Sequence, residues 1–235
     1  MTPADRLIVA LDHPSLQDAL TMARSLRGLV GTVKVGSVLL TAAGPVVRVR
    51  LQALGFRVML DLKFFDIPNT VEQSCRAAVH HRVTMLTVHA SGPPDMLRAA
   101  VRGARTTAKR LGVPRPLVLG VTVLTSMDRG RSTRLTSEVL RLARAAREAG
   151  CDGVVASTHE VAALRRRFGR RLAIVCPGIR PNRMRGDDQR RVATPADAVA
   201  AGADFLVVGR PITAARDPRA VVQTLLCEME AVDAC

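Results

Sequence analysis

The strongest constraint on the fold is an alternation: short β-branched or apolar runs are separated, along the whole chain, by stretches with helical patterns. Strands that alternate with helices in this way indicate βα units around a parallel sheet. Eight units in 235 residues predict a single-domain α/β protein with a (β/α)8 TIM-barrel fold, and a doubly wound open sheet is the alternative. The eight candidate strands are Leu7 to Leu11, Thr32 to Gly36, Arg57 to Leu62, Thr84 to His89, Leu117 to Val123, Gly153 to Ala156, Leu172 to Cys176 and Phe205 to Val208.

Helix-start signals lie in the gaps between these strands. Thr194-Pro195 and Asp217-Pro218 each place a capping side chain directly before a proline, which suits the first helical turn. The stretch Asn69 to Glu72 predicts a helix cap after the third strand. Within it, Thr70 is a candidate for the helix N-cap, as an alternative to a role in a functional site. No G-x-G-x-x-G motif follows the first strand, so a dinucleotide site is not indicated.

Composition argues against several classes of protein. The formal net charge is +15, but the chain has no Trp or Tyr to stack on bases, and its arginines are spread along the predicted helices. We therefore expect no nucleic-acid partner. No apolar run approaches the about 20 residues that a membrane span needs, and the N-terminus lacks the order of a secretory signal. We expect a cytoplasmic protein with no membrane contact.

Lysine is rare in this chain. Of the 35 basic residues only three are lysine, namely Lys34, Lys63 and Lys109, and the first two lie at strand ends. An ammonium group can give up a proton when its surroundings tune its pKa, whereas a guanidinium group stays protonated. Lys34 and Lys63 are therefore candidates for proton transfer, and a pair of salt-bridged lysines at the rim is the alternative.

The end of the third strand carries the densest group of charges. The stretch LDLKFFDIPNT places Asp61, Lys63 and Asp66 after an apolar run, and the active site of a barrel lies at such strand ends. Residues two apart in a strand point the same way, so we expect Lys34, Asp61, Lys63 and Asp66 to form an alternating row of bases and acids. Such a row keeps Lys63 protonated and suits it to act as a general acid. Because lysines interleave the carboxylates, we expect no metal and no other cofactor.

An anion site is predicted after the eighth strand. There Gly209 lets backbone N–H groups approach an anion, and Pro211 to Ala215 form one short helical turn. Arg210, together with Arg180 after the seventh strand, supplies guanidinium groups for a phosphate; a glycine turn with a surface arginine is the alternative. The loop from Arg180 to Arg191 is long and basic, which predicts a lid over an anionic ligand, or else a variable surface loop.

Seven motifs occur along the chain in one particular order. They are VALDHP at 9 to 14, VKVG at 33 to 36, DLKFFDIPNT at 61 to 70, TVLTS at 122 to 126, PGIRP at 177 to 181, DDQRRVATP at 187 to 195 and ADFLVVGRPIT at 203 to 213. Together they resemble the orotidine 5′-phosphate decarboxylase family over nearly the whole chain. The resemblance implies a barrel that converts orotidine 5′-monophosphate to UMP and carbon dioxide without a cofactor, the last step of de novo pyrimidine synthesis.

Roles for individual residues are implied by the same resemblance. It implies that Lys63 protonates C6 of the pyrimidine as carbon dioxide leaves, and that Asp61 crowds the substrate carboxylate and helps to hold Lys63. It also implies a homodimer in which Asp66 and Thr70 enter the partner's site. Many members have histidine where this chain has Phe65, and we expect that difference to have little effect on the chemistry. Further contacts to the ribose, base and phosphate are implied for Asp12, Lys34, Ile67, Thr125, Ser126, Arg180, Gln189, Gly209 and Arg210.

Two other interpretations stay open. A metal-dependent decarboxylase or aldolase of the same barrel superfamily, acting on a sugar phosphate, would share Asp61, Lys63 and Asp66. It leaves Gln189 and the Thr125-Ser126 pair without a role. A basic binding protein with an inactive barrel is the second alternative, and it leaves the charged row without one.

Overall fold

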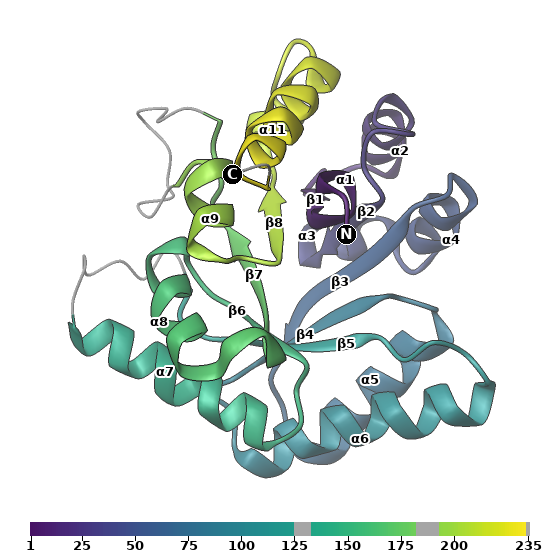
Figure 1. Cartoon of the computed structure of the whole chain (residues 1–235). Coiled ribbons are helices and arrows are strands. Elements are labelled where there is room, and N and C mark those ends of the chain that lie inside the picture. The colour runs from purple at the N-terminus through teal and green to yellow at the C-terminus, as the bar shows by residue number, and fades with distance from the viewer. Residues whose placement is uncertain (125–132, 182–192, 234–235) are drawn as a thin grey trace.

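The structure is a computed structural model, and it describes residues 1–124, 133–181 and 193–233. Within these ranges eight parallel strands close into a barrel in chain order, and β1 pairs with both β2 and β8 (Figure 1). The (β/α)8 barrel prediction is confirmed. The strands are β1 Leu7–Ala10, β2 Thr32–Gly36, β3 Arg57–Phe64, β4 Met85–His89, β5 Leu117–Val121, β6 Gly153–Val155, β7 Ala173–Pro177 and β8 Phe205–Val208.

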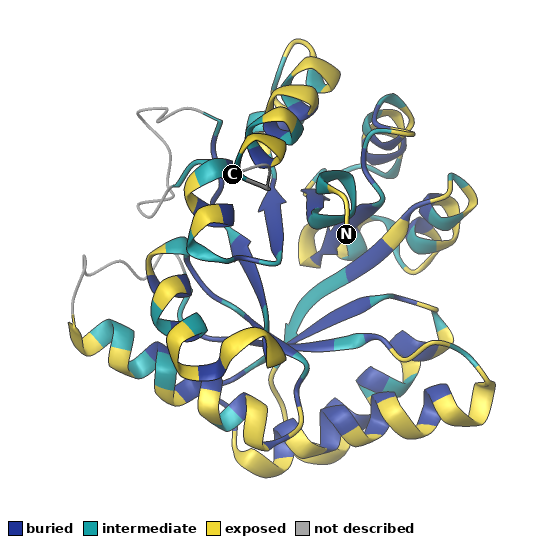
Figure 2. Cartoon of the chain, in the orientation of Figure 1, coloured by how far each residue is buried: buried dark blue, intermediate teal, exposed yellow. Residues whose placement is uncertain are grey.

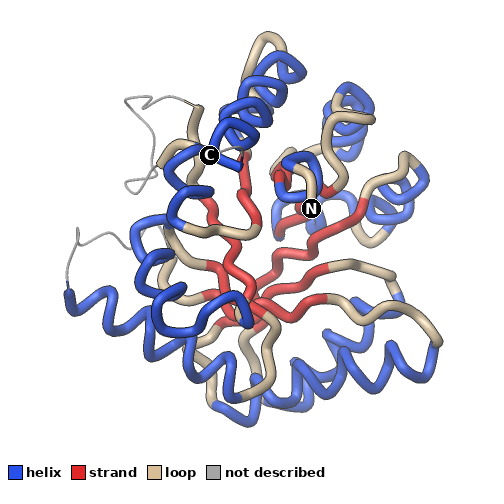
Figure 3. Tube along the Cα trace, in the orientation of Figure 1, coloured by secondary structure: helices blue, strands red, loops and turns tan. Residues whose placement is uncertain are grey.

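Helices surround the strands, as Figure 3 shows. Their buried faces turn toward the barrel and their exposed faces turn outward (Figure 2). None of the helices in the described ranges is both long and apolar enough to cross a membrane. The helices are α1 Pro3–Arg6, α2 Leu16–Ser25, α3 Ser37–Ala43, α4 Val46–Ala53, α5 Pro68–His80, α6 Pro94–Leu111, α7 Thr133–Glu148, α8 Thr158–Phe168, the 3-10 helix η1 Gly169–Arg171, α9 Pro195–Ala201, α10 Arg210–Thr213 and α11 Pro218–Asp233.

The helix starts agree with the sequence at two places and differ at a third. Thr194 accepts a hydrogen bond from the Asp197 N–H before α9, and Asp217 accepts one from the Ala220 N–H before α11. The prediction of a cap between Asn69 and Glu72, with Thr70 as the alternative N-cap, is wrong, because α5 begins at Pro68 after Ile67. Proline has a helical φ and lacks the N–H that would stay unpaired, which favours it at the first position of a helix.

Side chains alternate along each strand between the inside of the barrel and the layer under the helices. Ile8 and Met59 pack inside the barrel, whereas Leu7 and Val58 pack beneath the helices. The strand ends lie within two residues of the predicted ones, and the third strand is longer than predicted, because it continues to Phe64. The alternation carries residues 59, 61 and 63 of β3 to the inner side, so the charges of this strand reach the barrel mouth.

Candidate active site

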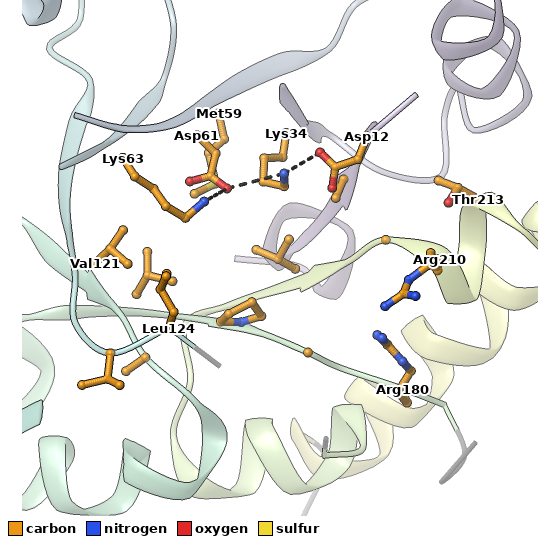
Figure 4. A pocket seen from close by; sticks show the side chains of 18 residues that line it. Asp12, Lys34, Met59, Asp61, Lys63, Val121, Leu124, Arg180, Arg210 and Thr213 are labelled. Carbon is orange, nitrogen blue, oxygen red and sulfur yellow. Dashed lines mark hydrogen bonds and ion pairs between the residues drawn. The ribbon is translucent and has the colours of Figure 1, made fainter. Parts of the chain in front are cut away.

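Four charged side chains form a connected row at the C-terminal mouth of the barrel. Asp12 follows β1, Lys34 lies on β2, Asp61 and Lys63 lie on β3, and all four line one cavity of about 450 Å³ (Figure 4). Lys34 Nζ lies 2.9 Å from Asp12 Oδ1 and 3.4 Å from Asp61 Oδ2. Lys63 Nζ lies 3.0 Å from the same Asp61 oxygen. Acids and bases therefore alternate along the row.

Asp61 is the central acid of this row. Its side chain is only 12% exposed, and burial by itself raises the pKa of a carboxyl group. The charges of Lys34 and Lys63 outweigh this burial, and hydrogen bonds from Lys63 and Thr87 add to them, so the pKa of Asp61 lies below its ordinary value. Asp61 is consequently ionised at neutral pH and presents a fixed negative charge beside Lys63.

Gly36 has no side chain, and this leaves space for the charged row. It lies opposite Asp61 in the ladder between β2 and β3. A Cβ atom at this position would lie 2.9 Å from Asp12 Oδ1 and 3.1 Å from Lys34 Nζ. A side chain here would displace the Asp12 carboxylate and crowd the Lys34 ammonium group, so a glycine at this position leaves both groups where they are.

Lys63 has an unusual backbone conformation. Its φ is 50°, in the left-handed region, where a non-glycine residue is strained by about 1–3 kcal/mol. The ladder between β3 and β4 is irregular at this point, because Leu60 pairs with Leu86 whereas Phe64 pairs with Val88. Such bulges turn side chains at active sites. Here the bulge lies at Lys63, whose side chain lines the cavity.

Two arginines lie at the end of the cavity away from Lys63 (Figure 4). Arg180 follows β7 and is buried, whereas Arg210 is exposed and begins α10 after β8. Figure 4 shows both guanidinium groups pointing into the cavity. Gly209 also lines the cavity and precedes α10, the short helix that the sequence predicted here. Two cationic groups beside a glycine backbone suit a phosphate group.

Asp66, Ile67 and Thr70 lie outside the cavity of their own chain. All three are exposed, and Asp66 Oδ1 accepts a hydrogen bond from the backbone N–H of Ile67 at 2.6 Å. Within one chain the row therefore ends at Lys63, and Asp12 forms its other end in place of the expected Asp66. After β3 ends at Phe64 the chain bends at Asp66 toward α5, which begins at Pro68, and this bend leaves Asp66 exposed.

Three of the expected contact residues fall outside the described ranges. They are Thr125, Ser126 and Gln189, and residues 182–191 of the predicted lid fall outside as well. Val123 and Leu124, which directly precede the first two, line the cavity. The roles of these residues and of the lid stay predictions.

Sequence reasoning missed Thr87, which supports the row from β4. Its side chain is completely buried, and its hydroxyl group donates a hydrogen bond to Asp61 Oδ1 at 2.9 Å. The available signal was a polar residue on the inward side of an apolar strand, two positions before His89. Polar residues at inward positions of a barrel strand need a partner, and this one pairs with the site.

His89 ends β4 beside the row. Burial, together with the nearby charge of Lys63, holds the pKa of His89 below its ordinary value, so the ring is neutral at neutral pH. Phe65 meets this ring edge-on, with the two centroids 5.9 Å apart. Across the part of the chain that the structure describes, no three His, Cys, Asp or Glu side chains are grouped to hold a metal ion.

Known proteins resemble this chain over almost its whole length. The sequence model of the family described as "Orotidine 5'-phosphate decarboxylase / HUMPS family" matches residues 5–225. A relative named orotidine 5′-phosphate decarboxylase from Moorella thermoacetica is 46% identical over 239 residues, which covers 99% of this chain and 95% of the relative. A relative of the same name from Nitratidesulfovibrio vulgaris (strain DP4) is 47% identical over 231 residues, covering 96% of this chain and 98% of the relative.

A solved structure agrees with these matches. The crystal structure of orotidine 5′-phosphate decarboxylase from Lactobacillus acidophilus has a TM-score of 0.83 and 35% sequence identity to this chain, and the match covers 96% of this chain and 99% of that one. The motifs, the barrel and the sequence matches agree over the same residues. This chain therefore belongs to the orotidine 5′-phosphate decarboxylase / HUMPS family.

Proposed function

We propose that this chain decarboxylates orotidine 5′-monophosphate to UMP and carbon dioxide, the last step of de novo pyrimidine synthesis, in the cytoplasm. The observation that carries the proposal is the cavity, with an alternating charged row along one side and two arginines at the end away from Lys63. The substrate has a matching layout, since its phosphate and its pyrimidine carboxylate lie at opposite ends. Relatives that share nearly half of the residues bear the name of this activity.

Lys63 is the proposed proton donor at C6 of the pyrimidine. When the bond to the carboxylate breaks, its electron pair stays on C6, and the proton of the Lys63 ammonium group takes the place of carbon dioxide. This step balances without an oxidant or a reductant, and we propose that it proceeds without a cofactor. The positive charge of Lys63 also stabilises the carbanion as it forms, which lowers the barrier where charge develops.

Asp61 contributes by raising the free energy of the bound substrate more than that of the transition state. Its ionised carboxylate lies between Lys34 and Lys63, so it faces the carboxylate of a bound substrate. Repulsion between the two carboxylates is relieved as carbon dioxide leaves, whereas the attraction between Lys63 and C6 grows. Catalysis depends on such differences between the ground state and the transition state. In the same proposal Asp12 and Lys34 bind the ribose.

The phosphate assignment predicts a loss of affinity in Arg210→Ala. We expect the KM for orotidine 5′-monophosphate to rise about 10- to 100-fold, because a hydrogen bond between charged groups is worth about 1.5–3 kcal/mol. Arg216→Ala is the matched control, since Arg216 is exposed and does not line the cavity. Steady-state kinetics measure both variants. An unchanged KM in Arg210→Ala would show that Arg210 does not bind the phosphate.

We further propose a homodimer whose two active sites lie at the interface. Val38, Phe65 and Ile67 follow the mouth ends of β2 and β3, and their side chains are 51%, 59% and 65% exposed. Exposed apolar side chains that form one patch mark a contact surface, and we propose that these three form such a patch. Asp66 lies between Phe65 and Ile67, and Thr70 is in the first turn of α5. A partner that covers this segment would receive Asp66 and Thr70 at its own site.

An absorbance assay that follows the loss of orotidine 5′-monophosphate tests the proposed function. We expect UMP and carbon dioxide to form, at a rate that a chelator leaves unchanged, because the proposed acid is a lysine. Activity that collapses with the chelator and returns with magnesium would favour a metal-dependent mechanism. A folded sample without turnover would favour a binding protein with an inactive barrel.

A further inference from the structure

We propose that Thr87 is a positioning residue that holds Asp61 and Lys63 in their reactive arrangement, an inference that rests on the proposed function. Thr87 lies in the middle of β4, is 0% exposed and does not line the cavity. It therefore contacts two catalytic groups without reaching the substrate, and any effect that it has on the reaction acts through them.

One hydroxyl group serves both catalytic residues. Thr87 Oγ1 accepts a hydrogen bond from the backbone N–H of Lys63 at 2.9 Å and donates one to Asp61 Oδ1, also at 2.9 Å. A hydroxyl group has one donor and two acceptor sites, so both bonds form together. The bond to Oδ1 leaves Asp61 Oδ2 for the two ammonium groups of Lys34 and Lys63. The two carboxylate oxygens thus have different partners, which fixes the rotation of the carboxylate.

The bulge in β3 explains why the Thr87 hydroxyl group also binds the backbone N–H of Lys63. Leu60 pairs with Leu86 and Phe64 pairs with Val88, so Thr87 is the single residue of β4 opposite positions 61 to 63. A bulge interrupts the backbone ladder, and backbone N–H groups there need another partner. The Thr87 side chain supplies that partner for Lys63, at the residue whose φ is 50°. The strained conformation of Lys63 is thereby held from the neighbouring strand.

Thr87→Val tests the proposal, because valine keeps the branched shape and removes both hydrogen bonds. We expect kcat for orotidine 5′-monophosphate to fall about 100-fold, the order of effect that a displacement of about 1 Å has on a catalytic group. The KM and the affinity for UMP should stay near those of the unsubstituted protein, since Arg180 and Arg210 lie at the other end of the cavity. Thr87→Ser restores the hydroxyl group and should recover most of kcat.

Thr84 supplies the matched control. It directly precedes β4, and its hydroxyl group donates a hydrogen bond to the backbone carbonyl of Val58 on β3 at 3.2 Å. Thr84→Val therefore makes the same substitution between the same two strands, at the end away from the charged row. We expect it to leave kcat unchanged. An equal loss of kcat in Thr84→Val and Thr87→Val would mean that Thr87 acts through stability alone, and the proposal would fail.

The pH dependence of kcat is a second measurement, and a loss of protein stability alone would leave it unchanged. The groups that face Asp61 are Lys34 and Lys63, its ion-pair partners, with Asp12 beyond Lys34 and with His89 on β4. A hydrogen bond to an ionised carboxylate lowers its pKa, so losing the Thr87 bond raises the pKa of Asp61. Because the reaction needs Asp61 ionised, the acidic limb of kcat should move to higher pH in Thr87→Val only. A limb that does not move would contradict the role toward Asp61.

A crystal structure of Thr87→Val tests the same inference without turnover. We expect the φ of Lys63 to leave the left-handed region and Lys63 Nζ to separate from Asp61, whereas Thr87→Ser keeps both features. If Thr87→Val kept the φ and the ion pair, Thr87 would not be a positioning residue. If the unsubstituted protein did not turn over orotidine 5′-monophosphate, the proposed function would fail, and the structural comparison would still decide the role of Thr87.

Discussion

Lys63→Ala is expected to lower kcat/KM for orotidine 5′-monophosphate by about 10⁴-fold or more, because it removes the group that we propose as the proton donor and as the positive charge beside C6. The fold should persist. The Lys63 side chain is 36% exposed, and alanine places the same Cβ on the left-handed backbone, so the change adds no strain. Asp61 keeps its ion pair with Lys34 at 3.4 Å. Steady-state kinetics measure the loss, and circular dichroism with a thermal melt checks the fold.

Two further lysine variants separate the contributions of Lys63. Lys109→Ala makes the same substitution at an exposed position of α6, away from the cavity, and should keep the rate of the unsubstituted protein. Lys63→Arg retains a positive charge, but a guanidinium group does not release its proton. A rate that stays far below normal in Lys63→Arg would identify proton donation as the larger part of the effect. A near-normal rate in Lys63→Ala would exclude Lys63 as the acid.

A dimer of one Lys63→Ala chain and one Asp66→Ala chain should regain activity that neither variant has alone. If Asp66 serves the partner's site, one site of the mixed dimer combines an intact Lys63 with an intact Asp66, and the other site lacks both. Random association of equal amounts makes about half of the dimers mixed, so about one quarter of the normal rate should return. Co-expression with two different tags isolates the mixed dimer for kinetic measurement.

The control for this experiment pairs Lys63→Ala with Asp61→Ala. Lys63 and Asp61 belong to the same chain's row, where they lie 3.0 Å apart, so neither site of that mixed dimer is complete and no activity should return. Recovery with Asp66→Ala but not with Asp61→Ala would assign Asp66 to the partner's site. A purified mixed dimer of Lys63→Ala and Asp66→Ala that stays inactive would contradict the shared sites.

Much of the barrel was predictable because its signals are local. The bounds of β2 and β8 match the prediction, and the caps at Thr194 and Asp217 depend on residues three positions away. The inward direction of Lys34, Asp61 and Lys63 also follows from a local property, the two-residue period of a strand. The cap expected near Thr70 failed where two local signals competed, because Pro68 begins the helix earlier.

The exact pairing of residues on neighbouring strands, in contrast, cannot be predicted from local sequence patterns. Strand alternation states which side of β3 carries Asp61, but it does not state which residue of β4 lies opposite. Asp61 and Thr87 are 26 residues apart, and their hydrogen bond exists only because the β3–β4 ladder shifts between Leu60 and Phe64. The left-handed φ of Lys63 belongs to the same shift. In the same way Gly36 matters only because Asp12 and Lys34 meet above it.

The sequence alone thus predicted a barrel, a row of charges at its mouth and two arginines beside the same cavity, since patterns within a few residues set strand direction and helix starts. Three-dimensional packing decided which groups touch. Within one chain the row runs from Asp12 to Lys63 without Asp66, and Thr87 forms hydrogen bonds with both Asp61 and Lys63. Contacts of this kind depend on the register between segments far apart in sequence. The register is set by the pairing and packing of the whole closed barrel, so no short stretch of residues determines it.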